Sequence, residues 1–190
     1  MKKKLEDMSL QELWQLFPIV LSPHQPVWES QFENEKNYLE SILESSRIRW
    51  IEQIGSTAIK TICSKSSVDI LIELKEGVSL DEFLEPLINA GYIVMSKNTH
   101  RISLNKGYTS EGYAEAVFHV HLRCFGDHDE LYFRDYLIEF SNEAKVYEAL
   151  KRELAQKHKY HRDNYTSQKT TYVQEITSKA KSYYGKKYER

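Results

Sequence analysis

The sequence predicts an α+β domain in which helices pack against a small mixed β-sheet. Three observations favour this fold class. Strand-type alternation and helix-type spacing interleave in the first half, two adjacent extended stretches can pair as a hairpin, and the remaining chain is helical. The 190 residues are 41% hydrophobic and 12% aromatic, which is enough to bury a core. Wholesale disorder is therefore excluded.

The N-terminal part of the chain is predicted to contain two helices and a strand. Ser9 and Glu12 form a capping-box pattern ahead of apolar residues, which predicts a short helix. A brief extended stretch follows at 19–21. Apolar residues then recur at helical spacing over 28–43, which predicts an amphipathic helix, and 47–54 has the character of a strand.

The middle of the chain continues the alternation of strands and helices. Residues 67–74 alternate apolar and polar side chains, as a strand with one buried face does. Ser79 begins a second capping-box pattern, and a helical stripe runs on to Ile88. Two short strands are predicted at 92–96 and 101–105, and they form the expected hairpin.

One more strand and a helical end complete the predicted fold. Residues 114–124 alternate, with apolar side chains on one face and, apart from Val117, polar side chains on the other. The stretch 105–113, with two glycines, is expected to be a mobile loop. Three helices are predicted to follow, at 129–139, 142–158 and 168–184.

The charge distribution divides the chain. The net charge is −2, but residues 1–150 carry −9 and residues 151–190 carry +7 together with 6 of the 13 tyrosines. Such a basic segment could cover an anionic ligand or a nucleic acid backbone, or it could simply pack on the acidic body. We expect an N-terminal helical extension (1–18), a main domain (19–160) and a basic, tyrosine-rich C-terminal helix packed on it (161–190).

The composition also bears on the location of the protein. No run approaches the roughly 18 apolar residues of a membrane span, and the basic start has no apolar stretch behind it. Neither a membrane partner nor a secretory signal is therefore expected. Cys63 and Cys124 lie far apart without a CxxC motif, which is typical of a reducing compartment, most simply the cytoplasm.

The junction after the strand 47–54 is a candidate phosphate site. Gly55 lets the backbone approach a ligand, Ser56 and Thr57 add hydroxyl donors, and Lys65 could supply a countercharge. Asp69 follows on the polar face of the next strand, where a carboxylate could hold Mg²⁺ beside the phosphates. Any helix cap can show the same glycine–serine pattern, so this junction also has a purely structural interpretation.

A second candidate constellation lies in the strand 114–124. His119, His121 and Arg123 share one face, with a rise of about 6.6 Å between alternate residues. The two imidazoles could converge on one metal ion or one phosphate, and Arg123 could grip a phosphate bidentately. The alternative is a solvent-facing row of polar residues. The remaining histidines, His128 among them, are expected at the surface or in caps.

Several short motifs, taken in their order and spacing, resemble one known family. They are Ile54-Gly55-Ser56-Thr57-Ala58-Ile59, Lys65 with Asp69-Ile70-Leu71, Gly91-Tyr92, His119-Val120-His121, Phe133-Arg134-Asp135-Tyr136-Leu137, and Tyr165 with Lys169. This pattern resembles the GrpB family over roughly residues 19–180. The resemblance implies a nucleotidyltransferase-like fold of the polymerase-β type. In such enzymes a Gly-Ser turn holds a nucleoside triphosphate and strand carboxylates bind Mg²⁺.

The resemblance implies a role for each candidate residue. Asp69, His119 and His121 would hold Mg²⁺ or another divalent metal and, with Ser56, form the catalytic group. The implied phosphate-binding residues are Gly55, Ser56, Thr57, Lys65, Arg123 and Lys169. Because Leu71 stands where the fold relatives carry a second carboxylate, His119, His121 or Glu115 would complete the metal coordination.

Three functions follow for testing. The first is nucleotide or phosphorylated-ligand binding with a divalent metal, with nucleotidyl transfer as the implied reaction. The second is a non-catalytic module that binds RNA or a protein through the basic C-terminal helix. The third is a metal-dependent hydrolase built on Asp69, His119 and His121.

Overall fold

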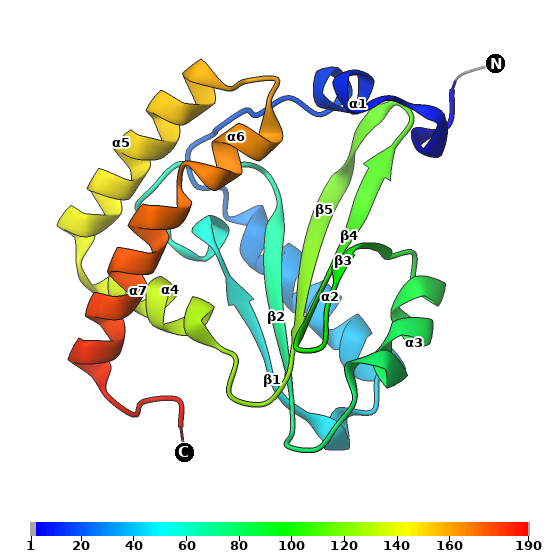
Figure 1. Ribbon diagram of the computed structural model, residues 1–190, viewed down its shortest axis with the longest axis vertical. Helices are drawn as coiled ribbons and strands as arrows, with labels where there is room; N and C mark the ends of the chain where they lie inside the picture. The colour runs from blue at the N-terminus through cyan, green and yellow to red at the C-terminus, as the bar shows by residue number, and fades with distance from the viewer. Residues whose placement is uncertain (1–2, 190) are drawn as a thin grey trace.

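The computed structural model describes residues 3–189, and these form one five-stranded mixed sheet with helices on both faces (Figure 1). The spatial order is β1-β2-β5-β4-β3. The central pair, β2 and β5, is parallel, and the other neighbours are antiparallel. The strands are β1 (Ile48–Ile54), β2 (Val68–Leu74), β3 (Ile93–Lys97), β4 (Arg101–Thr109) and β5 (Gly112–Arg123). The predicted α+β class is confirmed.

One face of the sheet is covered by α2 (Val27–Ile42) and α3 (Leu84–Asn89). The apolar positions of β2 and β5 point to this face, as their alternation predicts. Burial there forms the main core, which includes Trp28, Leu39, Ile70, Ile72, Leu87, Val120 and Leu122. Asp69 and His119 therefore lie on the opposite face.

The other side of the molecule is built by the C-terminal helices. They are α4 (Asp129–Glu139), α5 (Ser141–Lys157), α6 (Arg162–Ser167) and α7 (Thr170–Tyr184). A second apolar cluster joins α4, α5 and α7 to the segment after β1 through Ile59, Phe133, Leu137, Tyr147 and Ile176. Within the described part of the chain, no helix combines the length and the hydrophobicity that a bilayer crossing requires.

The basic C-terminal helix α7 is paired with the acidic body. Lys179 contacts Glu143 at 3.1 Å, and Lys181 contacts Asp129 at 2.7 Å. The hydroxyls of two tyrosines near its end bind Glu139 at 2.9 and 2.6 Å. The charge asymmetry of the sequence thus corresponds, at these positions, to packing of a basic helix on acidic residues.

The stretch 105–113 is not the loop that its glycines predict. Strand β4 continues to Thr109 and pairs with β5 from Gly112 onward, so the two strands join through a short turn. The rings of Tyr108 and Tyr113 lie 5.4 Å apart and 4.8 and 5.0 Å from the ring of Phe17. Phe17 directly follows α1 (Leu10–Leu16), whose predicted capping box is present. The contacts of Phe17, which is distant in sequence, with Tyr108 and Tyr113 stabilise the adjoining ends of β4 and β5.

Candidate anion-binding site

A cleft of about 980 Å³ lies between α4, α7 and the polar face of the sheet. Its floor includes Gly55, Asp69 and His121, and Lys169 stands at its wall. Apolar side chains from β1, α4 and α7, namely Ile54, Phe133 and Val173, line it as well. A mixed lining of this kind suits a ligand with a charged end and an apolar body.

Gly55 leaves room for the Asp69 carboxylate to lie against the backbone at the cleft. Its φ of 69° lies in the left-handed region, and a Cβ there would overlap with Oδ2 of Asp69 and lie 3.0 Å from its Cγ. The predicted helix after it is a single 3₁₀ turn, Ser56–Ala58. Ser56 is half-buried, whereas Thr57 is fully buried and accepts a hydrogen bond from Gln53 at 3.4 Å. Thr57 therefore does not face the cleft.

The structure brings Asp69, His119 and His121 together. Asp69 pairs with His119 in the parallel register of β2 and β5. Oδ1 of Asp69 lies 3.0 Å from Nδ1 of His119 and 3.5 Å from Nε2 of His121. Burial by itself would raise the pKa of Asp69, but the two imidazole hydrogen bonds outweigh it and hold that pKa well below its usual range. Asp69 is thus ionised throughout the physiological pH range.

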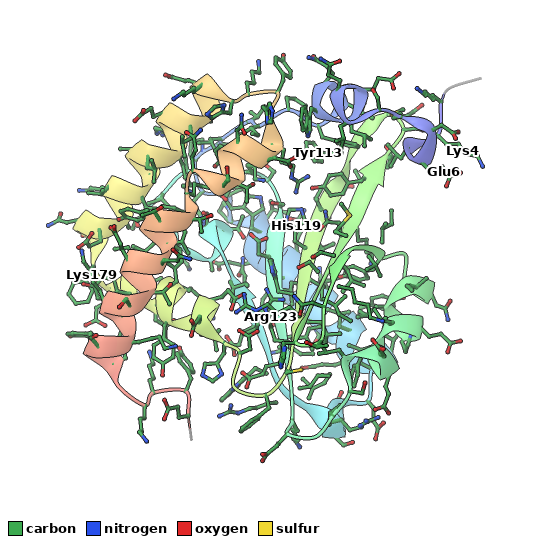
Figure 2. The ribbon with its side chains drawn as sticks, in the orientation of Figure 1. Lys4, Glu6, Tyr113, His119, Arg123 and Lys179 are labelled. Atoms are coloured by element: carbon green, nitrogen blue, oxygen red, sulfur yellow. The ribbon has the colours of Figure 1, made fainter. Side chains whose placement is uncertain are left out.

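The contacts of the two ring nitrogens fix the tautomer of His119. Nε2 lies 2.8 Å from the Tyr108 hydroxyl, and that hydroxyl accepts a hydrogen bond from Arg162 at 2.8 Å. Because the ionised Asp69 carboxylate only accepts, Nδ1 of His119 carries the proton and donates to it. In the neutral ring Nε2 then accepts the hydroxyl proton of Tyr108. Burial lowers the pKa of His119, which agrees with a neutral ring. Figure 2 places His119 and Arg123 in succession along β5, with Tyr113 nearer the hairpin tip.

His121 carries the opposite tautomer. Its Nδ1 lies 3.1 Å from a guanidinium nitrogen of Arg123 and so accepts, which leaves Nε2–H to face Asp69. Arg123 itself is buried and donates to Glu130 at 2.8 Å. The structure therefore engages Arg123 in positioning His121 and pairing Glu130, away from the phosphate-binding role that the sequence predicts.

These tautomers bear on the predicted metal site. A histidine binds a metal through an unprotonated nitrogen, and both imidazoles turn an N–H toward Asp69. Among residues 3–189, no group of three His, Cys, Asp or Glu side chains is arranged to hold a metal ion. Glu115 is exposed and lines a separate, smaller cavity. A site made from Asp69, His119 and His121 alone therefore does not fit this geometry.

Four cations without ion pairs surround this centre. They are Lys65, Lys151, Arg162 and Lys169. Within residues 3–189 none of them forms a salt bridge. Lys151 is buried and donates to the carbonyl of Cys63, while the ammonium groups of Lys169 and Lys65 lie 4.2 and 5.7 Å from the ring centre of Tyr165. Lys65, Arg162 and Lys169 are half-buried. Lysine and arginine side chains that are withdrawn from water usually pair with a carboxylate or another anion.

The comparisons with known proteins now identify the family. The family model described as "GrpB protein" matches residues 18–179. The chain belongs to the GrpB family. It is 33% identical to the glutamate-rich protein GrpB of Alkalihalophilus pseudofirmus, over 83% of this chain and 93% of that protein. The crystal structure of the conserved protein GrpB from Enterococcus faecalis is 29% identical with a TM-score of 0.74, covering 87% of this chain and 99% of that one.

A more distant likeness is to a polymerase. The Cid1 poly(U) polymerase in a structure with Mg 3′-dATP bound is 14% identical, with a TM-score of 0.48 over 77% of this chain and 46% of that chain. At this level the likeness says nothing about activity. The chemistry of this GrpB-family protein has to be argued from its own side chains.

Leu71 lies two residues after Asp69 in β2, on the same face of the sheet. It is fully buried and packs with Ile54 and with Leu131 of α4. An acid at this position would face apolar side chains, so the cleft of this GrpB-family protein is built around the Asp69 carboxylate on that strand.

Several residues of the site were not predicted from the sequence. Tyr108 lies in the supposed loop, Arg162 and Tyr165 lie in α6, where no helix is predicted, and Lys151 has the spacing of an ordinary helix surface. His128 is the N-cap residue of α4, one of the two positions expected for it, but it is buried and contacts the fully buried Glu73 at 2.9 Å. Two signals in the sequence pointed to this region: the motif of Tyr165 with Lys169, and the density of Lys, Arg and Tyr after residue 150.

The unpaired lysines predict an unusual pH dependence of stability. Burial, together with the nearby cations, lowers the pKa of Lys65 to about 7 and that of Lys169 to about 8. Between pH 7 and 9 the unfolded chain therefore binds more protons than the folded protein, and the free energy of unfolding should rise with pH. A Lys65→Met/Lys169→Met variant should melt higher than wild type at pH 7 and show a flatter slope. Thermal unfolding followed by circular dichroism measures both.

The matched control for this pH series is Lys179→Met, which removes a paired lysine of α7. This variant should keep the wild-type slope. Equal slopes in wild type and in the double variant would contradict the lowered pKa values of Lys65 and Lys169.

Proposed function

We propose that this GrpB-family protein binds a phosphorylated ligand, with a nucleotide as the expected class, in the cleft beside Asp69. The observation that carries the proposal is the group of four cations without ion pairs. Desolvating a cation costs free energy unless an anion compensates it, and here the nearby carboxylate of Asp69 already accepts two imidazole hydrogen bonds. A phosphate group would supply the missing negative charge.

The cleft fits such a ligand in size and lining. Its volume of about 980 Å³ lies at the upper end of the range for small-molecule sites. Lys169 and Gly55 line the cleft, and phosphate oxygens would accept hydrogen bonds from Lys169. Lys65, which lines a second, smaller cavity, and Arg162 would act through their positive charge from beside the cleft. The apolar part of the ligand would contact the side chains of β1, α4 and α7 that line the cleft.

A divalent metal would enter together with the ligand. Mg²⁺ is commonly bound by one or two carboxylates plus substrate phosphates and water. Asp69 would be the protein's ligand, since its recorded hydrogen bonds fall on Oδ1 within the described residues and Oδ2 lies toward Gly55. The ion would neutralise phosphate charge. His119 and His121 would keep Asp69 ionised and oriented.

The geometry favours binding over the other two functions. Nucleotidyl transfer with two metal ions requires paired carboxylates, and Leu71 replaces one of them. A metal hydrolase needs imidazole lone pairs directed at the ion, whereas both imidazoles present N–H groups to Asp69. Lys179 and Lys181 of the basic helix are paired with acids of the body, so a small phosphorylated molecule is favoured over RNA. We propose the cytoplasm as its location, on the spacing of the two cysteines.

Isothermal titration calorimetry with pyrophosphate and with ATP, each with and without Mg²⁺, tests the proposal. Lys169→Ala should weaken pyrophosphate binding by about tenfold or more, because charge-assisted hydrogen bonds contribute about 1.5–3 kcal/mol. Asp69→Asn should remove the Mg²⁺-dependent part of the affinity. Lys179→Ala, on the same helix but paired with Glu143, is the matched control. Failure of wild type to bind either compound would refute the proposal.

A further inference from the structure

The N-terminal segment contacts the residues that support the cation group. The ring of Trp14 lies 4.2 Å from the ring of His161. His161 is the N-cap of α6, and its Nδ1 accepts a hydrogen bond from the backbone of Asn164 at 3.4 Å. Arg162 is the next residue, so Trp14 packs on the side chain that directly precedes Arg162 in the chain.

Phe17 contacts the ring of Tyr108, whose hydroxyl binds Arg162. Phe17 is 7% exposed, and its ring lies 4.8 Å, centre to centre, from the ring of Tyr108 in an edge-on arrangement. That same Tyr108 accepts from Arg162 and donates to His119. Phe17 therefore fixes the position of a side chain that connects the cation group to the Asp69 centre.

Ile19 secures the remaining part of the group. Its backbone N–H donates to the carbonyl of Lys159 at 2.8 Å, just before α6. Its side chain packs in a small buried cluster with Leu154 and Tyr165. Tyr165 is the ring on which Lys169 and Lys65 lie.

We propose that Trp14–Ile19, the N-terminal brace, positions Arg162, Tyr108 and Tyr165 for ligand binding, so that affinity at the site depends on this segment. The inference rests on the proposed function of the cleft. Helix α6 has six residues, too few to be stable without tertiary contacts, and the brace supplies such contacts along its length. Trp14 and Phe17 precede residue 18, where the GrpB family match begins. Part of the control of the site thus lies outside the family region.

Pyrophosphate titration of the full chain tests the brace. Phe17→Ala and Trp14→Ala should each weaken binding about two- to tenfold, the range expected from loss of one aromatic contact. Phe17→Leu, which keeps most of the buried volume, should recover most of the affinity. Leu10→Ala, on the same helix and 63% exposed, is the control and should bind as wild type does. Combining Phe17→Ala with Arg162→Ala should weaken binding no further than Arg162→Ala alone.

Nitrogen NMR of the His119 ring gives a readout that needs no ligand. Wild type should show the Nδ1–H tautomer, and Phe17→Ala should shift population toward Nε2–H because Tyr108 is no longer held. If wild type does not bind pyrophosphate, the proposed function fails while this tautomer shift still tests the brace. An unchanged His119 spectrum in Phe17→Ala, or full additivity of Phe17→Ala and Arg162→Ala, would overturn the brace.

Discussion

Gly55→Ala is expected to abolish ligand binding in the cleft while leaving the protein folded. The new methyl group would overlap with Oδ2 of Asp69, so the carboxylate must leave its position against the backbone. Its hydrogen bonds with His119 and His121 would then be broken or lengthened. The left-handed φ of 69° adds a backbone cost of about 1–3 kcal/mol. We expect pyrophosphate affinity to fall at least about a hundredfold, the scale on which misplacing a key group by an ångström acts.

Gly77→Ala separates the effect of the left-handed backbone conformation from the effect of the overlap with Asp69. Gly77 has a φ of 78°, close to that of Gly55, but a Cβ there meets no heavy atom within 4 Å. Urea denaturation should show a similar backbone cost for the two variants, and calorimetry should show lost binding for Gly55→Ala alone. Equal affinities in the two variants would show that the close approach of Gly55 to Asp69 has no functional role.

Glu73→Gln is expected to cause a large loss of stability. Glu73 is fully buried and binds Arg49 at 2.9 Å, His128 at 2.9 Å and the backbone N–H of Gly126 at 2.8 Å. Burial would raise the pKa of Glu73, yet its hydrogen bonds hold it below the usual value, so the carboxylate is ionised. Removing one partner from a buried ionic cluster costs about 3–5 kcal/mol. Chemical denaturation should show this loss at pH 7.

The ionic cluster around Glu73 also predicts how the free energy of unfolding falls at low pH. Because the pKa of Glu73 is depressed in the folded protein, its contribution is present above the unfolded value and is lost as the pH falls through the folded one. Glu82→Gln is the matched control. Glu82 binds Arg47 in two hydrogen bonds but is about half exposed, so its replacement should lower the free energy of unfolding far less than Glu73→Gln does. Equal losses for Glu73→Gln and Glu82→Gln would contradict the assigned role of burial.

The sequence was informative where apolar and polar side chains recur at a regular spacing along the chain. Alternation in β2 and β5 predicts that Asp69, His119 and His121 lie on one polar face, and the parallel register of the two strands brings them within hydrogen-bonding distance. Periodicity reports which face a side chain takes, but it carries no information about which strands become neighbours or how an imidazole is protonated. For that reason the metal-ligand interpretation of the histidines, which the strand spacing suggested, stays a prediction.

The remainder of the site depends on contacts that no local pattern encodes. Tyr108 looked like part of a glycine-containing loop because its strand is stabilised by Phe17, which lies far away in sequence. Arg162 and Tyr165 lie in a helix too short to have its own periodicity. Lys151 has an ordinary helical spacing, and only tertiary packing makes it a buried cation.

The parallel pairing of β2 and β5 also affects the order of folding. Asp69 and His119 are 50 residues apart in the chain, and His119 and Arg162 a further 43, so each contact closes a long loop at an entropic cost. The binding centre is therefore assembled late, from segments that meet only once most of the chain is in place. A bound ligand should accordingly stabilise the native state of the whole chain against unfolding, and hardly at all any partly folded intermediate.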